Sequence, residues 1–165
     1  MTKHARLTLL AALLAAAWLL PFRGQDPADL LPVQTLVMDC RDGQVYLYGD
    51  GALEGQGASP AQAMDALVQN APGRAYLAQT EHLVVTEPAL SQVAALYEAA
   101  SLRLACGVFQ LSGQTLPRPE DLTDYLTAWS KRSEPCRLAR FLDNELAGQA
   151  AGPPRLDPER MRIDG

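Results

Sequence analysis

The spacing of apolar residues changes from strand-like to helix-like and back between residues 74 and 113. Residues 82–86 are a short run rich in β-branched side chains, and residues 102–111 are a second β-rich run. Between them, Pro88 begins a segment whose apolar side chains recur at helical spacing. A strand, a helix and a strand in this order predict a parallel pair of strands with the helix packed across one face.

A β-hairpin is predicted before this unit. Residues 32–39 and 44–48 are β-rich, and the turn over residues 41–43 contains a glycine, which tolerates positive φ. Residues 49–57 then hold four glycines but lack the sequence of a phosphate-binding loop. We interpret residues 49–57 as a mobile surface connection and as the best candidate for an adjustable contact surface, since recognition is commonly carried by loops.

Helical spacing dominates the rest of the chain. It predicts helices over residues 59–71, 119–129 and 133–146, the first of them capped by the Ser59 hydroxyl. Residues 149–165 contain three prolines and alternating charges, which predicts a flexible tail. The predicted fold class is α+β: a small mixed sheet in the order β-β-α-β-α-β, with helices packed on it and two further carboxyl-terminal helices.

The amino terminus has the pattern of an export signal. A basic segment precedes residues 7–20, an apolar run that is short for a membrane-spanning helix of about 20 residues. We predict that residues 1–24 are a signal peptide or an amino-terminal membrane anchor, with cleavage left open. No cysteine occurs before Cys40, so no lipid-attachment motif is present at the expected place. The predicted location is extracytoplasmic, either secreted or membrane-associated.

Length and charge constrain the part of the chain after the leader. Residues 25–31 read as a linker, and residues 32–148 have room for a single domain with one core. The chain has a net charge of −5 and two lysines among its 14 basic residues. Because nucleic-acid surfaces need clustered lysine and arginine to neutralise phosphates, this composition argues against nucleic-acid binding.

Three cysteines, Cys40, Cys106 and Cys136, lie far apart in the sequence and form no CxxC pair. An exported chain with three cysteines permits one disulfide and one free thiol. We favour the alternative that all three are small apolar residues of the core.

Few residues suit catalysis. His82 is the one histidine outside the leader, and it lies beside Glu81 at the start of a predicted strand. It could accept a proton or bind a ligand, but we favour a structural histidine bonded to a neighbouring backbone carbonyl. No nucleophile elbow, zinc motif or calcium loop is present. We therefore predict no catalytic, cofactor-binding or metal-binding residues, and no enzyme.

Two other groups have both a functional and a structural interpretation. Tyr125 and Trp129 could form a partner-facing aromatic patch, but their helical spacing favours core packing. Four acids cluster around the hairpin in sequence, and we interpret them as turn and solvent-facing residues: Asp39, Asp42, Asp50 and Glu54.

In the order of its elements and in several short motifs, the chain resembles the amino-terminal domain of Ger(x)C spore germination proteins. The resemblance covers about residues 30–154. Its motifs are Val37-Met38-Asp39 before Asp42-Gly43, the helix start at residues 59–63, the run from Tyr76 to Glu87, residues 102–107, the Phe141-Leu142 helix and Gly152-Pro153-Pro154. The chain departs from the family in lacking the lipid-attachment cysteine and the family's larger carboxyl-terminal domains.

This resemblance implies a non-enzymatic component of spore germination. In nutrient germinant receptors the C subunit lies at the outer face of the spore inner membrane, beside two integral-membrane subunits. The expected partners are therefore integral-membrane receptor subunits, with the membrane itself contacted through the amino-terminal segment. Two alternatives remain open: an exported hydrolase using His82 with a nearby carboxylate, and an envelope module that binds a small ligand.

Overall fold

The computed structural model describes residues 30–113, 115–149 and 152–164 of the chain. The strands are β1 (Leu30–Pro32), β2 (Thr35–Arg41), β3 (Gln44–Gly49), β4 (Leu53–Gly57), β5 (Arg74–Tyr76), β6 (His82–Thr86), β7 (Gly107–Leu111), β8 (Cys136–Arg137), β9 (Arg155–Asp157) and β10 (Arg162–Asp164). The helices are α2 (Pro60–Asn70), α3 (Val93–Ala100), α4 (Pro119–Ser130) and α5 (Leu138–Leu146), with 3-10 turns over Leu77–Gln79 and Glu87–Gln92.

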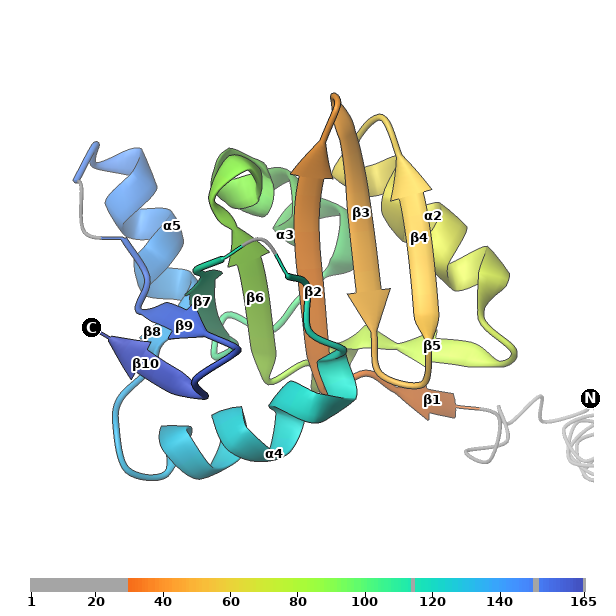
Figure 1. Cartoon of the computed structure of the whole chain (residues 1–165). Helices are drawn as coiled ribbons and strands as arrows, with labels where there is room; N and C mark the ends of the chain where they lie inside the picture. Colours follow the sequence, from red (N-terminus) through yellow and green to blue (C-terminus); the bar gives the residue numbers. More distant parts are fainter. Residues whose placement is uncertain (1–29, 114, 150–151, 165) are drawn as a thin grey trace, which may run out of the picture.

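One mixed sheet forms the centre of the fold. Its strands lie in the order β10-β9-β7-β6-β2-β3-β4, and the short β8 also pairs with β7 (Figure 1). β1 and β5 form a separate parallel pair. The predicted α+β class is confirmed, as are the two carboxyl-terminal helices, but the sheet is larger than predicted.

The hairpin prediction is confirmed, whereas the interpretation of residues 49–57 is wrong. β2 pairs antiparallel with β3, and after a tight turn Leu53–Gly57 forms β4, which pairs antiparallel with β3. A Cβ atom on Gly55 would lie 2.1 Å from the Ala63 carbonyl oxygen of α2, and one on Gly57 would lie 2.5 Å from Gln62 Cβ. These glycines therefore let α2 pack directly on the strand instead of making it mobile.

The parallel strands predicted around the second helix are present. β6 lies between β2 and β7 and is parallel to both. All five residues of β6 and all five of β7 are buried. Near-continuous burial is typical of central parallel strands that are covered on both faces.

Three boundaries differ from the predicted ones. α3 ends at Ala100, and its C-cap residue Ser101 adopts a left-handed conformation (φ 50°). The next strand begins only at Gly107 rather than at residue 102. The segment after Pro88 starts as a 3-10 turn, and α3 begins at Val93. Residues 133–137 are not helical: the last two form β8, which pairs with β7 before α5 starts.

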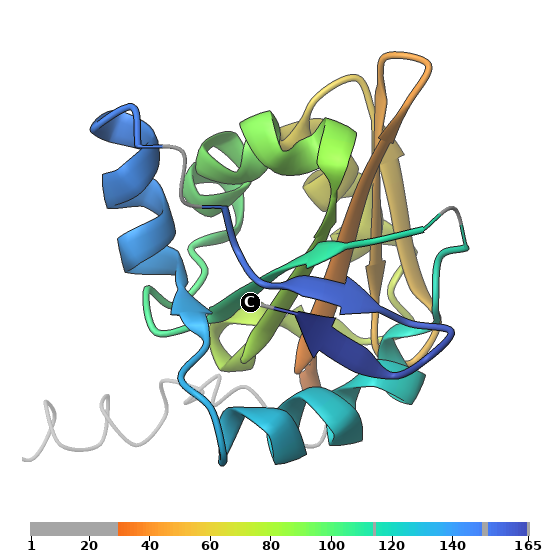
Figure 2. The same ribbon diagram turned by 60° about the vertical axis from the view of Figure 1, so that its left-hand side comes forward.

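Two apolar clusters cover opposite faces of the sheet. The larger one joins the sheet to α2, α3 and α5 through residues such as Leu67, Leu96 and Phe141. The smaller one lies between the sheet and α4 and includes Leu126 of α4 and Leu156 of β9. Figure 2 shows α4 on the opposite side of the sheet from α3. The face covered by α4 is the one that carries the polar features described below.

The prediction of a flexible tail over residues 149–165 is wrong for the described part of that segment. β9 pairs parallel with β7, and β10 pairs antiparallel with β9. Leu156 is fully buried, and the Asp157 carboxylate accepts hydrogen bonds from the amides of Glu159 and Arg160 in the turn after β9. The prolines lie outside the three-residue strands, where they do not interrupt the pairing. The domain therefore extends beyond residue 148.

The predicted leader over residues 1–24 lies outside the described residues, as does most of the predicted linker over residues 25–31, whose last two residues belong to β1. Within the described ranges, none of the helices combines the length and the apolar character needed to cross a bilayer.

Candidate functional site

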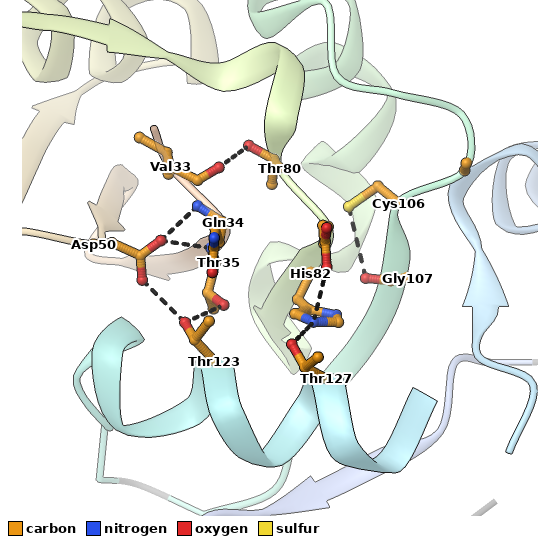
Figure 3. Close-up of polar contacts among 12 residues, drawn as sticks. Val33, Gln34, Thr35, Asp50, Thr80, His82, Cys106, Gly107, Thr123 and Thr127 are labelled. Carbon is orange, nitrogen blue, oxygen red and sulfur yellow. Dashed lines mark hydrogen bonds and ion pairs between the residues drawn. The ribbon is translucent and has the colours of Figure 1, made fainter. Parts of the chain in front are cut away.

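His82 lies at the amino end of β6, beneath α4. It is 3% exposed, and its Nε2 atom lies 3.2 Å from the Thr127 hydroxyl (Figure 3). Its ring meets Phe109 edge-on, with the ring centroids 6.0 Å apart. Burial lowers the pKa of His82, and the nearby Glu81 carboxylate only partly opposes this effect. His82 is thus bonded to a side-chain hydroxyl, not to the backbone carbonyl that we expected.

The contacts of the two His82 ring nitrogens differ from those in a catalytic triad. In a catalytic triad the nucleophile and the acid contact opposite nitrogens of the histidine ring. Here the Thr127 hydroxyl and the Glu81 carboxylate, at 4.0 Å, both approach Nε2, while Nδ1 has no partner among the described residues. Burial raises the pKa of the nearby Cys106 thiol to about 12, so this thiol is protonated at neutral pH.

The Asp50 carboxylate joins α4 to the same end of the sheet. It accepts hydrogen bonds from the amides of Gln34, at 2.5 Å, and Thr35, at 2.8 Å (Figure 3). It also accepts one from the Thr123 hydroxyl of α4, at 3.1 Å. The three donors come from two segments far apart in sequence, so Asp50 fixes the position of α4 on the sheet.

A second carboxylate holds the turn between β3 and β4. Glu120, in the first turn of α4, accepts hydrogen bonds from the amides of Gly51 and Ala52 at 2.8 and 3.1 Å. The pKa of Glu120 is lowered, first by a hydrogen bond from its own amide and then by those from the turn. The segment that the sequence suggested was mobile is therefore tied to α4.

The four acids near the hairpin are not one cluster. Asp42 and Glu54 are exposed, as predicted. The interpretation is wrong for Asp39, which is 4% exposed and lies within β2. Asp50 is a turn residue, as predicted, but it is partly buried and bonded to three donors. Asp39 lies near the carboxyl end of β2, whereas Asp50 comes after the opposite end of the hairpin.

A cleft of about 430 Å³ opens at the carboxyl ends of β2, β6 and β7, and we call it the polar cleft. Ligands of open parallel sheets commonly bind outside this end of the strands. Its polar lining includes Asp39, Arg41, Thr86, Glu87, Gln110 and Arg155.

The floor of the polar cleft is a buried carboxylate with two donors. The Thr86 hydroxyl donates to Asp39 Oδ1 at 2.6 Å, and Arg41 Nε donates to Oδ2. These bonds offset the cost of removing the charge from water. Gln110, near the carboxyl end of β7, is 8% exposed and also lines the cleft. Gln110 and Arg155 also line a neighbouring cavity of about 710 Å³.

Beside the polar cleft, part of the sheet face that carries α4 is not covered by a helix (Figure 1). We call it the open face and define it by the side chains of Arg41, Tyr46, Tyr48, Glu54 and Gln56. Those of β3 and β4 alternate along the strands with buried residues. Gln56 donates a hydrogen bond to the Tyr46 hydroxyl at 3.1 Å, and the Arg41 guanidinium lies 5.8 Å from the centre of the Tyr46 ring. These contacts hold aromatic and charged groups in place on a surface that water reaches.

The remaining predicted residues are structural. Cys40, Cys106 and Cys136 are unpaired. The core interpretation is confirmed for Cys106, which is buried in the larger apolar cluster, whereas Cys40 and Cys136 are partly buried and pack against that cluster. Tyr125 and Trp129 pack against the smaller cluster, which confirms that these two side chains take part in core packing. In the part of the chain that the structure describes, no histidine, cysteine, aspartate or glutamate residues form a group suited to holding a metal ion.

A scan of protein-family models and searches of curated proteins and of solved structures found no match to the chain.

Sequence reasoning missed most of the polar cleft, although a usable signal was present. Thr86 and Gln110 are polar residues at the ends of otherwise apolar strands, and Asp39 comes after the apolar run of β2 in the same way. Because the carboxyl ends of parallel strands meet at one edge, these polar positions predict a shared cleft. Arg155 could not be placed there, since its segment was interpreted as a tail.

Proposed function

We propose that this chain is a non-enzymatic, exported or membrane-tethered component of spore germination that acts by binding protein partners. The proposal is based on the resemblance to the first domain of Ger(x)C germinant receptor C subunits. The partners would be integral-membrane receptor subunits, and the location would be the outer face of the spore inner membrane.

The observation that carries the protein-binding part of this proposal is the open face. Tyr46 and Tyr48 are half-buried, so each presents an apolar ring and a polar hydroxyl to the surface. Tyrosine and arginine are enriched among the residues that dominate binding energy at protein interfaces. Arg41 lies beside Tyr46, and Glu54 and Gln56 provide polar groups next to the two rings. This combination suits an interface with an aromatic centre and a polar rim.

The test is recovery of partners from membranes of the organism that encodes the chain. We expect the full chain to recover an integral-membrane protein, and the double variant Tyr46→Ser, Tyr48→Ser to bind it about tenfold or more weakly. Tyr76→Ser is the matched control, because Tyr76 is an exposed tyrosine in β5, away from the open face. Normal spore germination after deletion of the gene, together with no recovered membrane protein, would contradict the proposal.

The polar cleft favours a second candidate function, the binding of a small polar ligand. The Gln110 amide can supply both a donor and an acceptor, and Arg155 adds a cation that forms no ion pair in the described part of the chain. Screening small metabolites against the full chain by ligand-observed NMR, with Gln110→Leu as the comparison, tests this function. A ligand that binds both proteins equally well would not be using the polar cleft.

A further inference from the structure

One side of α4 is held on the sheet by polar contacts at three positions. Glu120 accepts hydrogen bonds from the turn after β3, and Thr123 donates one to the Asp50 carboxylate. Thr127 contacts the His82 ring, with 3.2 Å between its hydroxyl oxygen and Nε2 (Figure 3). Positions three or four apart share one face of a helix, so these contacts form a row. Of the three, only the Thr127 contact includes a group whose ordinary pKa, 6.5, lies near neutral pH.

The second ring nitrogen of His82, Nδ1, is buried and has no hydrogen-bond partner among the described residues. A neutral imidazole carries one N–H, and Nε2 can bond to the Thr127 hydroxyl in either tautomer, because a hydroxyl both donates and accepts. A protonated imidazole carries an N–H on both nitrogens. In the closed fold the new Nδ1–H would have no acceptor and the charge would be buried, so the fold favours the neutral ring.

Burial lowers the pKa of His82, and the charged groups around the ring do not reverse this effect. Glu81 and, to a smaller extent, Asp50 raise the pKa. The Glu81 carboxylate lies 4.0 Å from Nε2, which already contacts Thr127, and its side chain is 54% exposed. Towards β7 the ring meets Phe109, which carries no charge. Two cations line the same small cavity as His82 and disfavour a charge on its ring: Arg103 and Arg137.

The position of α4 in the fold allows it to open without the rest of the domain. α4 covers the smaller apolar cluster, whereas α2, α3 and α5 pack on the larger one, on the opposite face of the sheet (Figure 2). Proteins commonly open in such local units, at a lower free energy than global unfolding. Opening of α4 would expose the His82 ring to water, together with the strand residues of the smaller cluster: Val37, Val84, Phe109 and Leu111.

We propose that His82 makes the attachment of α4 sensitive to acid: protonation of its ring favours an open state in which α4 has left the sheet. In the open state the ring has its ordinary pKa of 6.5, whereas in the closed state its pKa is lower. Above pH 6.5 the ring is neutral in both states, and the closed state has its full stability. As the pH falls from there to the lower pKa, the open state gains the proton first. Each pH unit in this window raises the opening equilibrium by up to about tenfold.

Hydrogen exchange of the full chain, purified in detergent and followed by mass spectrometry, tests this coupling. The protection factor of each amide is corrected for the effect of pH on its intrinsic exchange rate. Between about pH 7.5 and pH 5, we expect the protection factors in α4 to fall about tenfold, while those in α2 stay within about twofold. Equal protection of α4 at the two pH values would overturn the proposal, and so would an equal fall in α4 and α2.

The two histidines of the chain provide a matched pair of variants. His82→Gln should abolish the fall in α4 protection, because glutamine does not titrate, whereas His4→Gln should retain it. Each variant is compared with itself at the two pH values, so a constant loss of stability caused by the substitution cancels. A fall in α4 protection that persists in His82→Gln would overturn the proposal.

An NMR titration of the His82 ring needs no substitution at position 82. In His4→Gln the chain has a single histidine, so the ring signals belong to His82. We expect a titration midpoint below 6.5, and a midpoint at or above 6.5 would overturn the proposal. The inference does not depend on the proposed role in spore germination, because exchange and titration are measured on the chain without a partner.

Discussion

Replacing Gly55 with alanine tests how closely α2 packs on β4. The added Cβ would lie 2.1 Å from the Ala63 carbonyl oxygen, 2.6 Å from the Leu67 amide nitrogen and 2.7 Å from Leu67 Cβ. Two of these atoms belong to the helix backbone, so rotation of a side chain cannot relieve the clash. Overpacking of this kind costs about 1–3 kcal/mol, and we expect the upper end of that range.

Thermal unfolding followed by circular dichroism measures this cost. About 3 kcal/mol corresponds to a fall in Tm of roughly 6–12 °C for a chain of this size. Gly152→Ala is the matched control, because no atom lies within 4 Å of its added Cβ, and it should change stability by less than about 0.5 kcal/mol. If residues 49–57 were a mobile connection, Gly55→Ala would instead stabilise the protein by about 0.4–1 kcal/mol. An unchanged or higher Tm for Gly55→Ala would therefore refute this packing.

Three further substitutions test other parts of the fold. Leu156→Ala removes a fully buried side chain and should lower the free energy of unfolding, measured in urea, by about 2–5 kcal/mol. Leu146→Ala, at an 88% exposed position, should change it little. Equal effects of the two substitutions would contradict the placement of β9. Asp50→Ala leaves the backbone amides of Gln34 and Thr35 without their acceptor and should lower the free energy of unfolding by about 1–3 kcal/mol or more. Asp42→Asn is the control for losing an acid, because asparagine tolerates the positive φ of residue 42 in the exposed turn. The pKa of Glu120 is lower in the folded protein than its ordinary value of 4.5. The ionised carboxylate therefore stabilises the fold above pH 4.5, and this stabilisation is lost as the pH falls through the folded pKa. The urea midpoints of wild type and Glu120→Gln should therefore differ at pH 6 and converge towards pH 3, and a gap that widened on acidification would contradict this role.

Local sequence patterns were enough to predict the main elements. The Ser59 cap, the hairpin turn and the continuous apolar run of β6 each reflect physics that acts over a few residues. The parallel pairing of β6 and β7 could be predicted from chain order, because a helix between two strands leads to that arrangement. These features depend little on distant parts of the chain.

The errors arose where distant segments decide the structure. The glycines of β4 resemble a loop until α2 is placed against them, and only the tertiary structure shows that a side chain has no room there. The proline-rich carboxyl-terminal segment becomes ordered because β7 offers a free edge and the smaller cluster accepts Leu156. The polar cleft was missed for the same reason, since its residues come from four strands that meet only in the fold.

Site-specific photocrosslinking from the open face tests most directly whether the chain acts by protein contact. A benzophenone amino acid would replace Tyr48 in the full chain, expressed in its own host, and in a second strain it would replace Tyr76. We predict a crosslinked product with an integral-membrane protein from position 48 and none from position 76. No product from position 48, or the same products from both positions, would contradict the proposed function.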